Sequence, residues 1–332
     1  LLKISGNAHI VMPYHKDLDG VHEKKLGKNL IGTTKRGVGP TYMDKMNRTG
    51  LRIQDMLDEK IFRKKLEAAL EYTNPILSLV YGLPTYTVDQ ICETYLPYAD
   101  RIRPYIVESS LFLNEELEAG KNILFEGAQA TMLDIDHGTY PFVTSSSCTA
   151  GGAVTGSGVG PTNIDRVLGI AKAYLTRVGS GPFPTELFDE TGDLLGEVGH
   201  EYGVTTGRKR RCGWYDAVVV NYAARINGLT DLAITKLDVL GCLDEIKVCV
   251  AYECDGKIYK TVPEHQSVFY HAKPVYETLP GWKCDISNVR NFYQLPREAK
   301  DYIDFLEQLA GVRVSIITVG PDREQTIDRY WR

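Results

Sequence analysis

Short apolar runs alternate with longer helical patterns along most of this chain, and this alternation restricts the folds that it can adopt. Runs with the length and composition of buried strands lie at 123–125, 232–235, 247–252 and 314–319, and a run at 167–175 fits either a strand or a short helix. Helical patterns lie at 60–72, 87–118, 214–227 and 297–309. Strands that alternate with helices predict an α/β fold, with a mainly parallel central sheet flanked by helices and smaller inserted subdomains.

Local signals refine these boundaries. Thr87 and Gln90 form the pattern of a capping box at the start of the second helical segment, and Pro97 and Pro104 should kink or divide that segment. Gly228 follows the third helical segment as a stop signal. Residues 255–291 are more irregular and rich in tyrosine and proline, so we interpret them as an insertion or a small subdomain.

Composition excludes several classes of protein. The chain has 332 residues with a formal net charge of -5, which argues against a general nucleic-acid-binding surface. No apolar run approaches the roughly 20 residues of a membrane span. The seven cysteines are scattered, and the closest pair, Cys249 and Cys254, does not have the CxxC spacing. This usage favours a reducing cytoplasm over a disulfide framework or a zinc site.

Three segments are rich in glycine and hydroxyl side chains: Gly32–Gly39, Thr144–Gly160 and Val204–Arg211. The first and the third also contain cations. Glycine lets backbone N–H groups approach an anion, and arginine adds a planar fork that fits phosphate or carboxylate. One such segment alone is typical of an ordinary turn. Together they predict a site that holds several anionic groups. The four consecutive cations from Arg208 fit a solvated patch, a nucleic-acid patch or a ligand clamp, and the acidic balance argues against nucleic acid.

Thr235–Asp238 follows a buried strand, where ligands bind in open α/β sheets. The Asp238 carboxylate could accept hydrogen bonds from N1–H and the 2-amino group of guanine, and the Lys236 stem could lie on the base with its charge in water. The alternative is an ordinary lysine–aspartate surface pair. Gln129, at the end of the predicted strand 123–125, could bind a purine edge or simply bond to backbone. Asp134–His137 more often caps a turn than binds a metal.

Six segments together resemble adenylosuccinate synthetases, in the family's order and from near the first residue to near the last. They are Gly37–Arg48, Phe125–Thr149, Gly179–Asp189, Val204–Arg211, Thr235–Val239 and Gly320–Arg323. Several of these motifs are specific to the family. The resemblance implies one domain over 1–332 with a fold similar to that of P-loop NTPases.

The resemblance implies a GTP-dependent ligase that joins L-aspartate to inosine monophosphate (IMP) and gives adenylosuccinate in AMP biosynthesis. GTP would phosphorylate the 6-oxygen of IMP, and the aspartate amine would then displace that phosphate. The implied enzyme is a cytoplasmic homodimer that uses Mg²⁺. Its partners would be IMP, aspartate and GTP, with no nucleic acid and no membrane.

By motif, the resemblance assigns a role to each matched residue. IMP would be contacted by Thr34, Arg48, Gln129, Thr144 and Arg208, with Arg48 reaching the IMP of the partner subunit. Aspartate would be held by Val204, Thr205, Thr206, Gly207, Arg208, Lys209 and Arg210. GTP would be bound by Arg210, Lys236, Leu237, Asp238, Thr318, Val319 and Gly320. Lys45 and Gln129 would belong to the catalytic machinery.

One part of the family pattern has no counterpart here. The family's catalytic aspartate, its Gly-Asp-Glu-Gly-Lys-Gly-Lys phosphate loop and its catalytic histidine lie N-terminal to every matched segment. The resemblance therefore predicts an N-terminally truncated chain, with most Mg²⁺ ligands in the missing segment and no metal ligand assigned here. The alternative, if the chain is complete, is a non-catalytic nucleotide-binding or dimerisation module.

Overall fold

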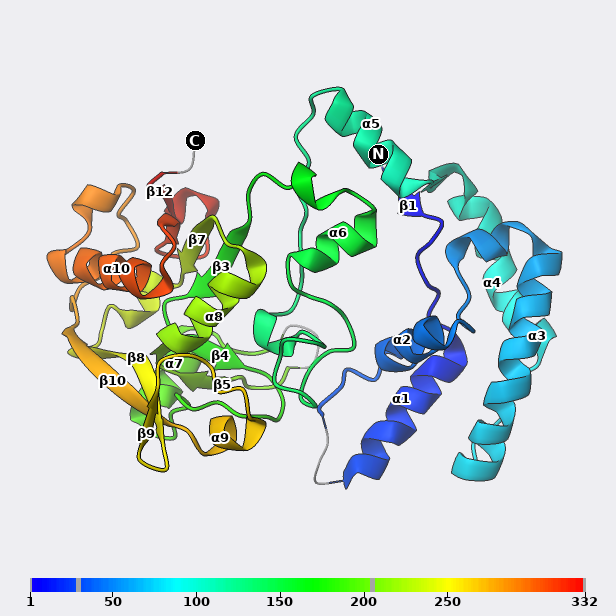
Figure 1. The fold of residues 1–332 in the computed structure, drawn as a ribbon, viewed down its shortest axis with the longest axis horizontal. Helices are drawn as coiled ribbons and strands as arrows, with labels where there is room; N and C mark the ends of the chain where they lie inside the picture. Colours follow the sequence, from blue (N-terminus) through cyan, green and yellow to red (C-terminus); the bar gives the residue numbers. More distant parts are fainter. Residues whose placement is uncertain (1, 28–30, 204–206, 331–332) are drawn as a thin grey trace. The chain divides into compact units, whose positions relative to one another are not determined.

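A computed structural model describes residues 2–27, 31–203 and 207–330 of the chain (Figure 1). The chain divides into two compact units. One comprises the residues up to 128 together with 143–163, and the other comprises 129–142 and the residues from 164 onward. Within the described residues, no helix has both the length and the apolar character that a membrane span requires.

The first unit is mainly helical (Figure 1). Its helices are α1 (Pro13–Leu26), α2 (Val38–Asn47), α3 (Glu59–Pro75), α4 (Val88–Ile102), α5 (Ser109–Glu118) and α6 (Gly151–Ser157). Two short strands, β1 (Ile4–Ser5) and β2 (Ile106–Val107), pair in parallel. The buried faces of α3 and α4 share one core through Phe62, Leu66 and Ile91.

Capping fixes where these helices begin. The Asp58 carboxylate accepts hydrogen bonds from the amides of Lys60 and Ile61, which starts α3. The predicted capping box is confirmed, because Thr87 and Gln90 bond reciprocally at the start of α4. The predicted helical segment 87–118 is divided, as expected, between α4 and α5. The break falls after Ile102 and not at Pro97, which lies inside α4.

The second unit contains a four-stranded sheet with strand order β12-β11-β7-β3. The strands β3 (Leu168–Lys172), β7 (Asp231–Thr235) and β11 (Val314–Thr318) are parallel, and β12 (Thr326–Asp328) adds an antiparallel edge. A second sheet joins β6 (Tyr215–Asp216), β8 (Glu245–Cys254), β9 (Lys257–Tyr259) and β10 (Lys273–Pro280), and β4 (Leu175–Arg177) pairs with β5 (Arg211–Gly213). The helices of this unit are α7 (Glu190–Val198), α8 (Ala217–Asn227), α9 (Gln266–His271) and α10 (Arg297–Ala310).

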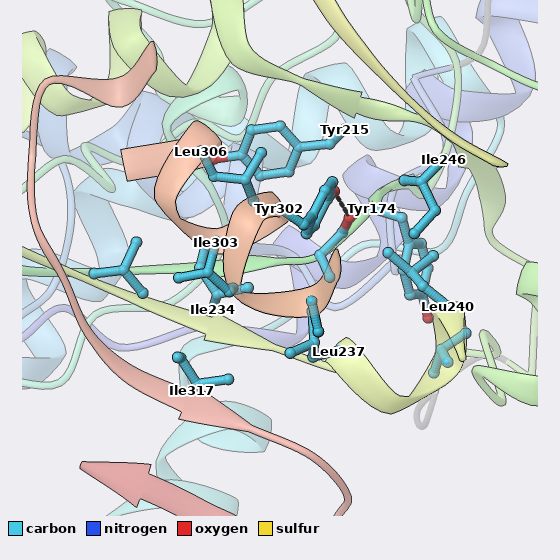
Figure 2. Packing of buried hydrophobic residues seen from close by; sticks show 14 of the residues in the cluster. Tyr174, Tyr215, Ile234, Leu237, Leu240, Ile246, Tyr302, Ile303, Leu306 and Ile317 are labelled. Atoms are coloured by element: carbon cyan, nitrogen blue, oxygen red, sulfur yellow. Dashed lines mark hydrogen bonds between the residues drawn. The ribbon is translucent and has the colours of Figure 1, made fainter. Parts of the chain in front are cut away.

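The core of the second unit packs α10 against the parallel strands (Figure 2). Tyr302, Ile303 and Leu306 of α10 belong to the same buried cluster as Ile234 of β7 and Ile317 of β11. The Tyr302 hydroxyl donates a hydrogen bond to the carbonyl of Ala173 at 2.6 Å, so its one polar atom is satisfied inside this core. This packing holds the carboxyl ends of β7 and β11 rigidly in place.

Most of the predicted elements are confirmed. The runs 232–235, 247–252 and 314–319 lie in β7, β8 and β11, and 167–175 contains β3 and the start of β4. The predicted helices 60–72, 214–227 and 297–309 correspond to α3, α8 and α10, with α8 beginning three residues later than predicted. Residues 255–291 contribute β9, α9 and β10, and β10 pairs with β8 along its length.

The predicted strand at 123–125 is wrong. These residues form no strand, and Leu124 is 92% exposed. Three apolar residues are too few to stabilise a strand unless a neighbouring strand pairs with them, and no described strand does so. Gln129 therefore does not follow a strand terminus.

Candidate functional site

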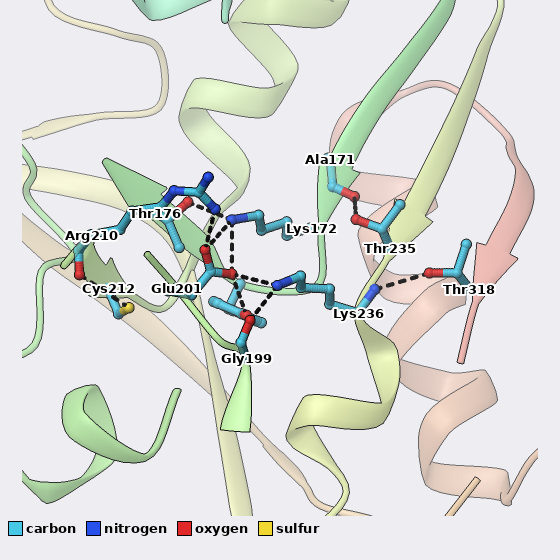
Figure 3. A network of polar contacts seen from close by, with 11 residues as sticks. Ala171, Lys172, Thr176, Gly199, Glu201, Arg210, Cys212, Thr235, Lys236 and Thr318 are labelled. Atoms are coloured by element: carbon cyan, nitrogen blue, oxygen red, sulfur yellow. Dashed lines mark hydrogen bonds and ion pairs between the residues drawn. The ribbon is translucent and has the colours of Figure 1, made fainter. Parts of the chain in front are cut away.

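The carboxyl ends of β7 and β11 form the predicted nucleotide side of the site. Lys236 directly follows β7 and has a left-handed backbone with a φ of 60°. Its amide donates a hydrogen bond of 3.1 Å to Oγ1 of Thr318, the last residue of β11 (Figure 3). A residue of this type is rarely held in such a conformation unless its surroundings fix it, as at ligand-binding turns.

Asp238 lies two residues further on, in the short 3₁₀ helix η7 (Leu237–Leu240). Its Oδ1 atom is buried and has no hydrogen-bond partner among the described residues. Burial raises the pKa of the Asp238 carboxyl above its ordinary value. Since a buried acceptor without a donor costs free energy, this atom has the character of a ligand contact.

Three other predicted nucleotide contacts are Leu237, Val319 and Gly320, and none of them has a polar side chain. The side chains of Leu237 and Val319 are fully buried in the core, so only their backbone groups are available to a ligand. Gly320 lies against the side chain of Gln325, and a Cβ atom at position 320 would be 2.1 Å from Gln325 Oε1. A larger residue at position 320 would therefore displace the side chain of Gln325.

Glu201 is the centre of a cluster of charged side chains beside this turn (Figure 3). Its carboxylate is completely buried and accepts hydrogen bonds from Lys172 at 2.8 Å, Tyr174 at 2.6 Å, Arg210 at 2.7 Å and Lys236 at 3.0 Å. Burial alone would raise the pKa of Glu201, but the donors Lys172, Tyr174 and Arg210 lower it to about 2.

This cluster corrects one interpretation of the sequence. The charge of Lys236 does not lie in water, because its Nζ donates hydrogen bonds to Glu201 and to the carbonyl of Gly199. Lys172, at the end of β3, is half-buried as well, and burial lowers its pKa although Glu201 opposes this effect. Three cations thus share one carboxylate where two parallel strands end.

The predicted aspartate-binding segment is partly described. Val204, Thr205 and Thr206 lie outside the described residues. Gly207 has a φ of 64°, and its amide bonds to the carbonyl of Gly203, whose own amide bonds to the carbonyl of Arg208. These bonds form a tight hairpin that presents Arg208 at the surface.

The three cations after Arg208 are each paired with a carboxylate. Lys209 bonds to Asp193 at 2.7 Å, Arg210 to Glu201, and Arg211 to Glu186 and to the carbonyls of Gly179 and Gly181. These ion pairs remove the uncompensated charge that a nucleic-acid patch needs.

In the first unit, carboxylates hold the backbone of the segment 32–37. The amides of Gly32 and Thr33 donate to Glu23, and the amide of Gly37 donates to Asp19 at 2.9 Å. In this structure α1 therefore supplies the anions that these amides bind. Thr34 remains exposed at the tip of this segment.

Helix α2 presents the predicted Lys45 and Arg48 on an exposed surface. His15 of α1 fixes this helix: its Nδ1 accepts from the amide of Met12 at 2.9 Å, and its Nε2 bonds to Asp44 at 2.9 Å. Because Nδ1 accepts a hydrogen bond, the neutral imidazole carries its proton on Nε2. Arg48 ends α2 with a left-handed φ of 65°.

The remaining predicted residues are placed as follows. Thr144 shares a hydrogen bond of 3.0 Å with Ser146. Gln129 is exposed and has a φ of 67°. Asp134 accepts hydrogen bonds from the amides of Asp136 and His137 at 3.0 Å, so it caps a turn. Across the described residues, no group of three or more histidine, cysteine or acidic side chains is arranged to hold a metal ion.

Comparison with known proteins identifies the family. The model of the adenylosuccinate synthetase family matches residues 1–327. The chain belongs to the adenylosuccinate synthetase family. It is 58% identical over 329 residues to the synthetase of Leifsonia xyli subsp. xyli, covering 99% of this chain and 75% of that protein. It is 59% identical over 327 residues to that of Thermobifida fusca, covering 98% and 77%.

A solved structure agrees with this family assignment. The fully ligated adenylosuccinate synthetase of Plasmodium falciparum superposes with a TM-score of 0.93 at 39% identity, covering 99% of this chain and 78% of that one. The predicted α/β fold is confirmed. As a member of this family, the chain is a GTP-dependent ligase of aspartate and IMP in AMP biosynthesis.

Several residues of the site were not predicted from the sequence: Asp19, Glu23, His15, Lys172 and Glu201. None belongs to a local motif. Lys172 could have been found by the signal that identified Lys236, since it also stands at the end of a parallel strand.

Proposed function

We propose that this adenylosuccinate synthetase reads the guanine of GTP at the carboxyl ends of β7 and β11, with Asp238 as the discriminating residue. The buried Oδ1 of Asp238, which no described donor satisfies, supports this assignment most directly. A carboxylate accepts hydrogen bonds from N1–H and the 2-amino group of guanine, whereas adenine does not offer this pair of donors. Thr318 and Gly320 line the base pocket, and Leu237 and Val319 support it.

The other contacts follow the family motif. Arg210 binds GTP, Thr34, Thr144 and Gln129 bind IMP, and Arg208 serves both IMP and aspartate. The segment 204–210 binds aspartate, and Lys45 and Gln129 act at the reaction centre. GTP phosphorylates the 6-oxygen of IMP, and the aspartate amine then displaces phosphate. Exposure of Thr34, Lys45, Gln129 and Arg208 supports these roles, because each can reach a ligand.

Magnesium would neutralise the charge that develops on the transferring phosphoryl group. The described residues do not form a cage for this ion, so no step is assigned through it here. The position of the family's catalytic aspartate and histidine, N-terminal to every matched segment, stays a prediction. We assign no catalytic acid or base among the described residues.

We also propose a homodimer in which Arg48 reaches the IMP of the partner subunit. Arg48 is exposed at the end of α2, and it forms no ion pair with any described residue. Met43 and Met46 of the same helix are 61% and 71% exposed. Exposed methionines beside cations are a composition that protein interfaces favour, which supports α2 as part of the subunit contact.

The substitution Asp238→Asn tests the assignment of guanine recognition. An asparagine presents one acceptor and one donor, which match N1–H and the 2-oxo group of xanthine. The ratio of kcat/KM for GTP to that for xanthosine triphosphate should fall by about 10- to 100-fold, because one mismatched buried polar contact costs about 1–3 kcal/mol.

Asp285→Asn is the matched control, because this exposed carboxylate acts on Asp238 electrostatically without belonging to the turn. It should leave the ratio unchanged. An unchanged ratio in Asp238→Asn would remove Asp238 from base recognition. An equal change in both variants would mean that overall charge, and not base reading, sets the preference.

A further inference from the structure

His15, in the first turn of α1, lies against both ends of α2 in the first unit. Its side chain is 1% exposed. Gly37, which directly precedes α2, packs so closely that a Cβ atom there would be 2.9 Å from the backbone carbon of His15. In the last turn of α2, the Asp44 carboxylate lies 2.9 Å from His15 Nε2. One buried residue of α1 thus contacts the start and the end of α2.

The two ring nitrogens of His15 have different partners. Nδ1 accepts a hydrogen bond of 2.9 Å from the amide of Met12, and it also lies 3.0 Å from the hydroxyl of Thr41. Nε2 carries the proton and donates it to the Asp44 carboxylate. The bond to Nδ1 therefore caps the start of α1, whereas the bond from Nε2 joins α1 to the last turn of α2.

Asp44 also determines the path of the backbone after α2. Its carbonyl accepts hydrogen bonds from the amides of Thr49 at 3.0 Å and Gly50 at 3.1 Å, and the amide of Arg48 bonds to the same carbonyl. These bonds hold Arg48 at its left-handed φ of 65°. An arginine rarely adopts this conformation unless its surroundings fix it. The direction of the Arg48 side chain therefore depends on the position of Asp44.

The start of α2 has a separate attachment to α1. The Asp19 carboxylate accepts a hydrogen bond of 2.9 Å from the amide of Gly37. When the bond between His15 and Asp44 is lost, the last turn of α2 is loosened, but its start stays attached. The consequence should fall on Arg48 at the end of the helix.

We propose that His15 is a positioning residue for IMP, which acts through Asp44 on the direction of Arg48. This role rests on the proposed contact between Arg48 and IMP. Because His15 is 1% exposed, it acts through α2 and not by direct contact with the ligand. The planar fork of an arginine binds an anionic group well only in the correct orientation, so a shift of α2 weakens this contact.

Two substitutions separate the two hydrogen bonds of His15. In His15→Asn, the amide oxygen lies near the position of Nδ1 and can still accept from Met12, but the bond to Asp44 is lost. In His15→Gln, the amide nitrogen lies near the position of Nε2 and can still donate to Asp44, but the bond from Met12 is lost. The pair of variants therefore distinguishes the bond that caps α1 from the bond that holds α2.

Steady-state kinetics of the full-length protein at saturating GTP and aspartate measure the effect. His15→Asn should raise the KM for IMP by about tenfold, within the roughly 100-fold that a misplacement of about 1 Å can cost. His15→Gln should raise it by less than about threefold, and neither variant should change the KM for GTP by more than about twofold. A purely structural role would lower the amount of folded protein, and hence kcat, in both variants without this difference in KM. No rise in His15→Asn, or an equal rise in His15→Gln, would overturn the proposal.

Tyr86→Phe is the matched control. The Tyr86 hydroxyl donates a hydrogen bond of 2.5 Å to Asp17, so this substitution removes a bond that joins α1 to the segment before α4 and not to α2. The KM for IMP should be retained in this variant. If it rises as much as in His15→Asn, any loosening of α1 has the same effect, and His15 has no special role.

Asp44→Ala provides a second variant in case His15→Asn does not fold. It breaks the same bond from the other side, so the KM for IMP should again rise by about tenfold. Loss of a carboxylate beside Lys45 and Arg48 would on charge alone favour an anionic ligand, so an unchanged or lower KM would contradict the proposal. In Arg48→Leu, neither substitution should raise the KM further, because both act through Arg48. If Arg48→Leu alone leaves the KM for IMP unchanged, the proposed contact of Arg48 fails, and His15 loses this role with it.

Discussion

The segments 32–48 and 201–211 both combine glycines with cations, but carboxylates hold different parts of them. In 32–48, Asp19 and Glu23 bind backbone amides, while Lys35, Arg36, Lys45 and Arg48 form no ion pair with the described residues. In 201–211, the carboxylates Asp193, Glu201 and Glu186 bind the side chains of three successive cations.

The two segments therefore differ in how freely their cationic side chains can move to contact a ligand. When carboxylates fix the backbone, the cationic side chains stay in water and can reach outward to a ligand or another subunit. When carboxylates fix the side chains, the cations are already oriented. A ligand must then either compete with the carboxylates for these cations or bind beside the ion pairs. The first arrangement suits Arg48, and the second suits Arg210 and Lys236.

The largest expected effect comes from removing the carboxylate that binds side chains. Glu201→Gln should lower the free energy of unfolding of the second unit by about 3 kcal/mol, because it leaves three half-buried cations without their counter-charge. Glu23→Gln should lower that of the first unit by about 1 kcal/mol, since an amide oxygen still accepts from Gly32 and Thr33. Urea titration measures both. Tryptophan fluorescence reports the second unit through Trp214 and Trp282. Circular dichroism reports the helices of both units, so a dichroism change that fluorescence does not follow reports the first unit.

The pH dependence of the free energy of unfolding shows whether the charge of Glu201 causes this loss of stability. The pKa of Glu201 is lowered to about 2 in the fold, so its contribution is complete above the unfolded pKa of about 4.3 and is lost as pH falls toward 2. The shift corresponds to about 3 kcal/mol. Acid should therefore destabilise the unsubstituted second unit more than that of Glu201→Gln. If the two proteins are equally sensitive to acid, a titrating group other than Glu201 is responsible for the loss of stability.

The next prediction concerns Arg48, which we expect to contact the IMP of the partner subunit. Arg48→Leu should raise the KM for IMP by about 10- to 100-fold, since it removes a charge-assisted pair worth roughly 1.5–3 kcal/mol. Arg48→Leu subunits are then mixed with subunits substituted at Gln129. If Arg48 acts in trans, a mixed dimer has one site with both defects and one with neither, so activity partly returns. Confirmed mixed dimers without recovery would place Arg48 in its own subunit's site.

The sequence predicted β7 and the turn after it well, because a buried strand followed by Thr235–Asp238 is a local pattern. It could not predict Glu201, whose partners Lys172 and Lys236 are 29 and 35 residues away. Helix α1 was missed for a related reason, because part of its buried face is charged and includes Asp19 and Glu23. The error at 123–125 has the opposite origin, since an apolar run forms a strand only if a partner pairs with it.

The smallest effect is expected within the hairpin itself. Lys209 and Asp193 form their ion pair at an exposed position, with the two side chains 50% and 69% exposed. Exposed pairs of this kind contribute little, so Lys209→Met should change the KM for aspartate by less than about fivefold. Arg208→Leu should raise the same constant by more than about tenfold, if Arg208 binds the substrate carboxylate as proposed.

Steady-state kinetics at saturating GTP and IMP compare these two neighbours directly. The hairpin presents both residues, and the charge of Lys209 is compensated by the solvent-exposed carboxylate of Asp193, which competes with the ligand. If Lys209→Met raises the KM as much as Arg208→Leu, the ion pair with Asp193 must open when aspartate binds. The distinction between cations that carboxylates hold and cations that act on a ligand would then fail at this position, and it would be limited to the buried cluster around Glu201.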